Sequence, residues 1–412
     1  MWNDFRDIRF LDLSKTIWKL VRRMAEEKRA QISQLFLFVS AFLVQAIMGM
    51  IGIAVPIYAN FLGASPFLLG IIGGAGGLVY SFVPLIFGTL SDRFRRKWFI
   101  VASMCLCSLS CLLYNISDDP AEIAIIKVLE STSVAAFWPA IEALIADTDE
   151  KNLEEFLRKF NISWGTAMIV GPAIGGGLIS AYSFKAPFLV ALVISLFIGS
   201  ASPALINELK KGSSNVEKGK QSPLGKNDVK LSSALLAIFL FSSLGGMAAS
   251  LFPAYATNLG IPAYEIGLIM LFWGVARVIT FYSSSKIEKR LSKKGMFIAG
   301  SSILAVASFL IANSSMFLSF AICFLIFGFG SGILYSASIS SILRRWSFSR
   351  GYAAGLFESL IGVGYFLGPI IGGAVSTYGA NAPYIFGSLL GFSALSIQLI
   401  LNMKLKRKES EI

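Results

Sequence analysis

The chain has 412 residues, of which 55% are hydrophobic and only 15% are charged. Soluble domains typically carry about 25% charged residues, so this composition excludes a water-soluble fold and indicates a membrane protein. The net charge of +12 does not indicate nucleic-acid binding, because no basic face is interleaved with aromatic residues. With no histidine and no ligand-like spacing among its four cysteines, the sequence predicts neither a metal site nor another cofactor.

Along the chain, twelve apolar stretches are long enough to form a membrane-spanning helix, which needs about 20 residues. They centre near Val44, Gly77, Cys107, Val134, Val170, Ser195, Gly245, Phe272, Ala305, Gly330, Val363 and Phe392. Six of them fall in each half of the chain. The sequence therefore predicts an all-α membrane protein with twelve transmembrane helices in two six-helix bundles.

These stretches divide the chain into two bundles and three polar segments. The N-terminal bundle is predicted over residues 31–207 and the C-terminal bundle over 231–404, with a linker at 208–230 and a tail at 405–412. Residues 1–30 are too charged for a cleaved signal peptide. They form either an amphipathic helix at the membrane surface or a solvated cytoplasmic tail.

The two predicted bundles are copies of one another in sequence. The segments PIYANFLG, residues 56–63, and PAYATNLG, residues 253–260, lie about 197 positions apart. The same offset relates two helix-packing motifs, Gly171, Pro172 and Gly175 in the first half and Gly368, Pro369 and Gly372 in the second. Such glycines let a neighbouring helix approach closely, and the proline permits bending. Duplicated, pseudo-symmetric halves in so hydrophobic a chain are typical of transporters.

Lys and Arg are concentrated on one side of the predicted membrane topology. Nearly all of the 36 lie in the terminal segments and in the loops on that side, whereas the opposite loops hold only Lys185. Lys127 and Arg277 are the exceptions, because they lie inside predicted helices. Since Lys and Arg are retained in the cytoplasm, both termini are predicted to be cytoplasmic in a multi-pass protein of the cell membrane.

A charged loop, GTLSDRFRRK at residues 88–97, follows the second predicted helix. It resembles the signature loop of the major facilitator superfamily, although Arg95 stands where that family usually has glycine. The matching positions that we assign to a conformational gate are Gly88, Asp92, Arg93, Arg96 and Lys97. The resemblance implies the major facilitator fold, in which this aspartate latches the cytoplasmic ends of the two halves together.

The fourth predicted helix extends the resemblance to the drug/proton-antiporter branch of the superfamily. Lys127, Glu130, Ser131 and Ser133 stand where proton-driven efflux members have Arg, Gln, Gly and Gly. The motif GPAIGG at residues 171–176 likewise resembles the proline-glycine motif of antiporters. Because the second half repeats it, duplicated helix packing explains that motif equally well.

Charges on the fourth predicted helix gather on one face. At about 100° per residue, Lys127, Glu130, Trp138 and Glu142 share that face. Each buried charge costs at least about 2.5–3.5 kcal/mol in a bilayer, so we expect the face to border a cavity. Lys127 and Glu130 could instead form a structural pair, whereas Glu142 has no basic partner nearby in the sequence.

Two further charges lie inside predicted helices of the second half, Arg277 and Glu358. Each is expected to act as a substrate counter-ion or to pair with a charge of the opposite half. Without histidine, a proton carrier within the membrane must be a carboxylate. The proton-coupling candidates are Glu130, Glu142 and Glu358.

The family resemblance also implies that the first, fourth, seventh and tenth helices line a substrate cavity. On these helices the candidates for its lining are Gln45, Lys127, Trp138, Ser243 and Tyr335, and Arg277 of the eighth predicted helix joins them because of its charge. Their mixture of aromatic, apolar and charged character suits an amphipathic solute better than a fully hydroxylated sugar.

No GxxxxGK[ST] nucleotide-binding loop is present, so the sequence favours a gradient-driven secondary transporter over an ATP-driven pump or an enzyme. We expect a monomer whose two halves rock about a site between them. Its partners would be a small-molecule substrate, protons and the lipid bilayer. The preferred hypothesis is proton-coupled efflux of an amphipathic or drug-like compound. Import of a sugar or organic anion, or a non-transporting receptor of the same fold, remain alternatives.

Overall fold

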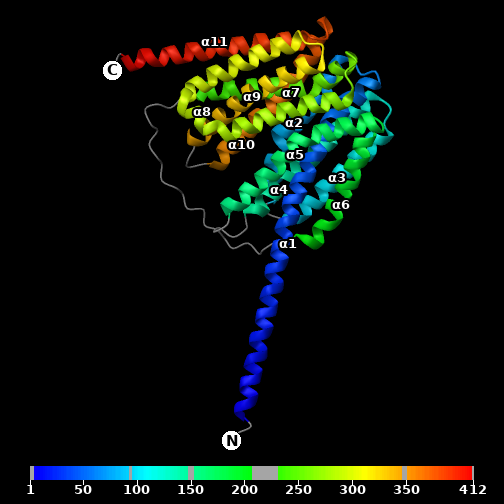
Figure 1. Ribbon diagram of the computed structural model, residues 1–412, viewed down its shortest axis with the longest axis vertical. Coiled ribbons are helices and arrows are strands. Elements are labelled where there is room, and N and C mark those ends of the chain that lie inside the picture. Colours follow the sequence, from blue (N-terminus) through cyan, green and yellow to red (C-terminus); the bar gives the residue numbers. More distant parts are fainter. Residues whose placement is uncertain (1–3, 92–94, 147–152, 207–230, 346–349, 411–412) are drawn as a thin grey trace.

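The computed structural model describes residues 4–91, 95–146, 153–206, 231–345 and 350–410 (Figure 1). Across these ranges the chain is helical apart from short loops and one 3₁₀ turn, Ser376–Tyr378, as the composition predicted. The helices of the first half are α1 Asp4–Phe61, α2 Pro66–Ser91, α3 Arg96–Ile116, α4 Pro120–Ala146, α5 Leu153–Ala181 and α6 Ala186–Leu205. Those of the second half are α7 Leu231–Asn258, α8 Ala263–Ala312, α9 Phe317–Arg345, α10 Arg350–Val375 and α11 Ala382–Ser410.

Within the described ranges, 11 helices are long and apolar enough to cross a membrane. All of the predicted centres lie in these helices, but two of them, near Phe272 and Ala305, share α8. That helix has 50 residues, about 75 Å at 1.5 Å per residue, which exceeds a bilayer core of about 30 Å. Its helical geometry breaks at Ser292, where φ is 58° and ψ is 167°.

The chain folds back at this break, as the contacts of α9 indicate. Gly328 of α9 lies against Ala276, before the break, and Gly330 lies against Ile303, after it. In a straight helix those two α8 positions would be about 40 Å apart and could not both reach adjacent turns of α9. The parts of α8 before and after Ser292 are therefore two separate helical segments that both pack against α9.

The two halves use the duplicated glycine motifs in the same way. Within the first half, Gly171 of α5 lies against Ala46 of α1, and within the second half, Gly368 of α10 lies against Ser243 of α7. Because α1 corresponds to α7 and α5 to α10 in the sequence repeat, the two contacts are equivalent. Each motif thus fastens one helix to the first helix of its own half.

Equivalent contacts also join the halves to each other. Gly70 of α2 lies against Pro369 of α10, and Gly267 of α8 lies against Pro172 of α5. Both members of the second pair are displaced from the first by the offset of the sequence repeat. The interface between the halves is therefore pseudo-two-fold symmetric, and it depends on glycines that admit a neighbouring backbone.

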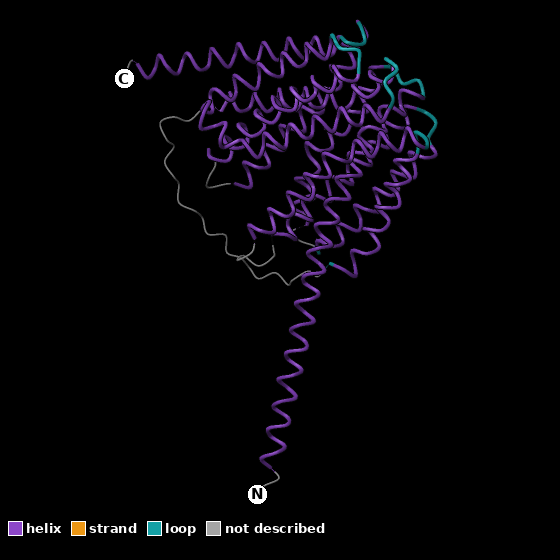
Figure 2. The backbone as a smooth tube through the Cα atoms, viewed as in Figure 1, coloured by secondary structure: helices purple, strands orange, loops and turns teal. Residues whose placement is uncertain are grey.

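The halves are joined most closely at one end of the molecule, which we call the closed end. There the Asn60 side-chain amide donates a hydrogen bond to Asn258 at 2.9 Å, and the Tyr264 backbone N–H donates to the Ser180 hydroxyl at 3.0 Å. The short loops between helices gather at this end (Figure 2). From it the two groups of helices diverge toward the opposite end, where α6 ends and α7 begins (Figure 1). We call this the linker end.

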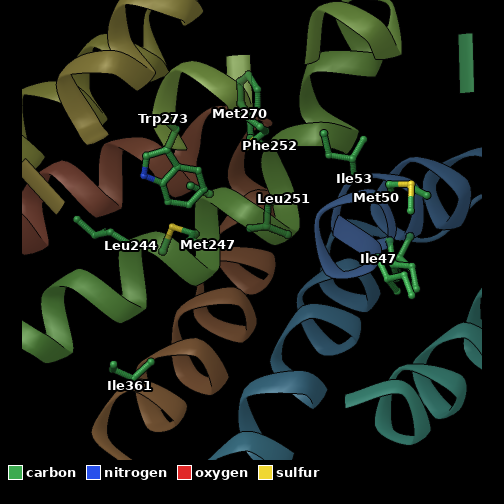
Figure 3. Packing of buried hydrophobic residues seen from close by; sticks show 14 of the residues in the cluster. Ile47, Met50, Ile53, Leu244, Met247, Leu251, Phe252, Met270, Trp273 and Ile361 are labelled. Carbon is green, nitrogen blue, oxygen red and sulfur yellow. The ribbon is translucent and has the colours of Figure 1, made fainter. Parts of the chain in front are cut away.

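A continuous apolar core runs through both halves. Figure 3 shows Ile47 and Met50 of α1, Leu251 of α7 and Met270 of α8 within it, all of them buried.

The first part of α1 lies outside this core. The helix begins at Asp4 and projects from the bundle as one uninterrupted helix (Figure 1). The choice between a membrane-surface helix and a solvated segment for residues 1–30 stays open.

Candidate functional site

Two carboxylates from opposite halves approach each other toward the linker end. Glu142 lies near the end of α4, Glu358 lies near the start of α10, and the two interact electrostatically. The Tyr80 hydroxyl of α2 shares a hydrogen bond with Glu358, which ties the halves together at this level. Next to it, the Ser359 hydroxyl donates to the Ser81 carbonyl at 3.4 Å.

Accessibility shows that these carboxylates border an opening. Protein surrounds both carboxyls closely, yet Glu142 is exposed to solvent and Glu358 is partly exposed. A side chain enclosed by protein but still reached by solvent lines a cavity. Glu142, Glu358 and Tyr80 therefore line a space between the halves on the side away from the closed end.

Arg277 lies in α8 and is held by aromatic rings. Its guanidinium carbon is 4.5 Å from the ring centroid of Trp273 and 5.8 Å from that of Phe241, and the guanidinium donates to the Tyr365 hydroxyl. Its Nε atom is buried without a hydrogen-bond partner in the described part of the chain. Among the described residues, Arg277 forms no ion pair with Glu358, the other charge inside a predicted helix of the second half.

The groups around this arginine in the described structure are neutral. Placing a charge within a membrane costs at least about 2.5–3.5 kcal/mol. Two cation–π contacts of about 0.5–2 kcal/mol each and the hydrogen bond to Tyr365 offset this cost without supplying an opposite charge. No carboxylate among the described residues forms an ion pair with Arg277. Of the expected partners, an anionic group of a substrate is therefore the one that this geometry leaves open.

Tyr335 of α9 lies between these two charged centres. It interacts electrostatically with both Glu358 and Arg277. Its ring centroid is 5.4 Å from that of Phe241, 5.1 Å from Phe281 and 5.2 Å from Phe357. Partly exposed itself, it gives the C-terminal half an aromatic wall from Arg277 to the carboxylate pair.

Lys127 and Glu130 form the local ion pair that their spacing allowed. The Glu130 side chain is 5% exposed and also accepts a hydrogen bond from the Tyr114 hydroxyl at 3.4 Å. The Ser133 hydroxyl donates to the Glu130 carbonyl at 2.7 Å. Glu130 is thus bound into the interior of the N-terminal half, unlike Glu142, although its role in proton coupling stays a prediction.

The remaining cavity candidates differ in their surroundings. Gln45 is partly buried in α1, and Trp138 packs edge-on against Trp164 of α5 at a centroid distance of 6.4 Å. Ser243 is buried in the contact of α7 with Gly364 and Gly368 of α10, and its role in a cavity stays a prediction. Glycines on α10 bring that helix over Ser243, so its hydroxyl is buried by packing.

Only part of the predicted gate motif lies within the described residues. Gly88 belongs to the last turns of α2, whereas Asp92 and Arg93 fall outside the described ranges. Arg96 is buried at the start of α3 and donates from Nη1 to the Ala143 carbonyl at 2.7 Å. A cation at the carboxyl end of α4 also suits the helix dipole. The Lys97 ammonium lies 5.8 Å from the Trp98 ring centroid.

Sequence reasoning missed Tyr80 and Tyr365. For Tyr80 a signal existed, because the repeat offset places it at the position equivalent to Arg277. The same offset relates Trp138 to Tyr335. Comparing equivalent positions of the two halves would therefore have added Tyr80 to the candidates, whereas nothing in the sequence singled out Tyr365.

An all-helical fold with duplicated halves and charged groups between them is that of a membrane transporter. The sequence matches the Major Facilitator Superfamily over residues 37–344 and again over residues 234–411. The chain therefore belongs to the major facilitator superfamily, as the loop at residues 88–97 suggested, and it is a multi-pass protein of the cell membrane.

Several curated proteins are similar over most of their length. Multidrug resistance protein 1 of Bacillus subtilis is 25% identical, covering 82% of this chain and 89% of its own. Quinolone resistance protein NorA of Staphylococcus aureus is 25% identical over 90% of this chain and 98% of its own. An uncharacterized MFS-type transporter of Methanocaldococcus jannaschii is 26% identical over 81% and 88%. The two resistance proteins agree with the drug/proton-antiporter resemblance.

Solved structures share the fold at lower identity. The nucleoside transporter NupG has a TM-score of 0.69 at 15% identity, covering 89% of this chain and 98% of its own. A bacterial homologue of the human lysosomal transporter Spinster, in an inward-facing conformation, has a TM-score of 0.69 at 13% identity, covering 90% and 95%. Both comparisons establish the fold alone.

Proposed function

We propose that the chain is a proton-coupled exporter of amphipathic, drug-like compounds that operates by alternating access. The observation that carries this proposal is the pair of carboxylates, Glu142 and Glu358, that approach from opposite halves beside a solvent-reached space. The similarity to proteins named for multidrug and quinolone resistance supports the direction and the substrate class.

The proposed topology has twelve crossings. Counting the parts of α8 before and after Ser292 as separate spans gives six crossings in each half. The distribution of Lys and Arg then assigns the linker end and both termini to the cytoplasm. In this topology the closed end is extracellular, the described conformation faces inward, and Asp92 stands at the cytoplasmic gate.

The carboxylate pair offers a physical route to coupling. Two carboxylates at close range repel each other, and a proton or a cationic group between them removes the repulsion. A conformation that brings Glu142 and Glu358 together therefore retains a proton, and one that separates them releases it. A cationic, amphipathic substrate that enters between them takes the place of the proton, which is the exchange that an antiporter requires.

The test is flux into proteoliposomes under an imposed pH gradient, with a fluorescent lipophilic cation as the probe. We expect Glu142→Gln and Glu358→Gln to abolish pH-driven flux while solute exchange down its own gradient continues. Glu155→Gln, which alters an exposed carboxylate of α5, is the matched control and should keep wild-type coupling.

Each other outcome points elsewhere. Full pH dependence in both site variants would refute coupling through this pair and return attention to Glu130. Accumulation only under the gradient that drives uptake would favour the importer of a sugar or organic anion. A wild-type protein without flux of any tested solute would favour the receptor.

A further inference from the structure

We propose that Arg277 and the rings around it form a subsite for the carboxylate of an aromatic substrate, so that the transported compounds include aromatic acids and zwitterions. This inference rests on the proposed transport function and assigns a second ligand contact to the same cavity, apart from the carboxylate pair.

The first support is the contrast between Lys127 and Arg277, which both lie well inside membrane helices. Lys127 is neutralised within its own helix by Glu130. Arg277 instead contacts aromatic faces and one phenol, with its Nε atom unsatisfied in the described structure. Because a guanidinium keeps its charge at any relevant pH, this charge stays available to an anion.

The second support is the loss of symmetry at this position. The repeat offset makes Arg277 equivalent to Tyr80, whose neutral hydroxyl forms a hydrogen bond with Glu358 of the opposite half. The C-terminal half thus carries a cation where the N-terminal half carries a phenol. A structural requirement of the shared fold would be met equally well by tyrosine, so the charge indicates recognition of a ligand.

The third support is the shape of the surroundings. The buried rings of Trp273 and Phe241 hold the guanidinium in place, and the partly exposed Tyr335 continues the aromatic wall toward Glu358. A planar aromatic group can stack on the exposed part of Tyr335 while its carboxylate accepts two hydrogen bonds from the guanidinium fork. A basic group at the other end of such a molecule would reach the carboxylate pair.

The experiment compares two probes of the same shape, 2-naphthoate and 2-naphthamide, by calorimetric titration of the purified full chain. Wild-type protein should bind the naphthoate at least tenfold more tightly than the neutral amide. Arg277→Gln should remove this preference and leave naphthamide binding unchanged. Arg290→Gln, at an exposed arginine of the same helix, should keep the preference.

Arg277→Lys covers the case in which the glutamine variant does not fold, because it retains the charge but lacks the fork. It should weaken naphthoate binding several-fold without affecting naphthamide. Equal binding of the two probes by wild-type protein, or an undiminished preference in either Arg277 variant, would overturn the subsite. Because binding needs no gradient, a protein that transports the lipophilic cation but shows no preference contradicts this inference alone. One that binds naphthoate selectively but transports nothing contradicts the proposed function alone.

Discussion

Replacing Gly267 with alanine should shift the protein out of the conformation described above. Gly267 lies on α8 at the closed end, where α5 of the opposite half crosses it. A Cβ added there would be 2.7 Å from the Pro172 carbonyl oxygen and 3.0 Å from the Ala173 Cα. Both neighbours are backbone atoms, so no side-chain rotation can relieve the overlap and the two halves must move apart at this end.

The size of the effect follows from the cost of overpacking. An extra methyl group in a close-packed contact costs about 1–3 kcal/mol, and each 1.4 kcal/mol changes an equilibrium about tenfold. The closed end should therefore lose about 5- to 150-fold in population relative to a conformation that is open there. Gly70→Ala, at the pseudo-equivalent contact with Pro369, should act in the same direction.

Distances between spin labels at Tyr182 and Tyr378 would measure this shift. Both residues are highly exposed at the closed end and belong to opposite halves, and replacing the exposed Cys105 prevents stray labelling. Gly267→Ala should add a population with a longer distance. Gly177→Ala, where an added Cβ meets nothing within 4 Å, is the control. Identical distance distributions in the two variants would refute the packing argument.

Two further predictions concern ion pairs, and thermal unfolding in detergent checks both. Lys127→Met should destabilise the protein by about 3–5 kcal/mol because it leaves Glu130 buried without its partner, and an added Glu130→Gln should restore most of the loss; wild-type stability in the single variant would contradict a structural pair. At the surface, a hydrogen bond from Lys185 and its positive charge hold the pKa of Asp118 below its usual 3.8. The stability that this pair contributes is therefore fully present above pH 3.8 and is lost as the pH falls through the lowered pKa. The difference in unfolding temperature between wild type and Lys185→Gln should therefore be present at neutral pH and vanish in acid. A difference that persists in acid would contradict a stabilising Lys185–Asp118 pair.

The helical spans and the duplication could be predicted because both can be recognised in the sequence itself, the spans as apolar stretches and the duplication as repeated segments. Apolar length identifies a membrane helix, since backbone groups in a bilayer must be satisfied within the segment. The offset between residues 56–63 and 253–260 then relates positions that prove equivalent in space, as Gly70 and Gly267 do. Periodicity also placed Lys127 and Glu130 on one helix face, where they form their pair.

The partners of the isolated charges could not be predicted, because they depend on how helices from different parts of the chain approach. Helical spacing carries no information on the meeting of Glu142 with Glu358, which lies more than 200 residues away in the sequence. The surroundings of Ser243 were equally unpredictable. The glycines that bring α10 against Ser243 are remote from it in the sequence.

Comparison of equivalent positions separates what the fold needs from what the substrate needs. Where the repeat offset relates small or aromatic residues, such as Gly70 with Gly267 and Trp138 with Tyr335, the chemistry is similar in both halves. At the two carboxylates that meet between the halves it is not, because Glu142 corresponds to Ile339 and Glu358 to Asn161. A rocking motion requires matched packing on the two sides of the pseudo-axis, whereas an asymmetric solute requires unmatched charges. The residues that break the symmetry are therefore those in which we expect mutation to alter selectivity and coupling, and the residues that keep it are those in which mutation should alter the balance between conformations.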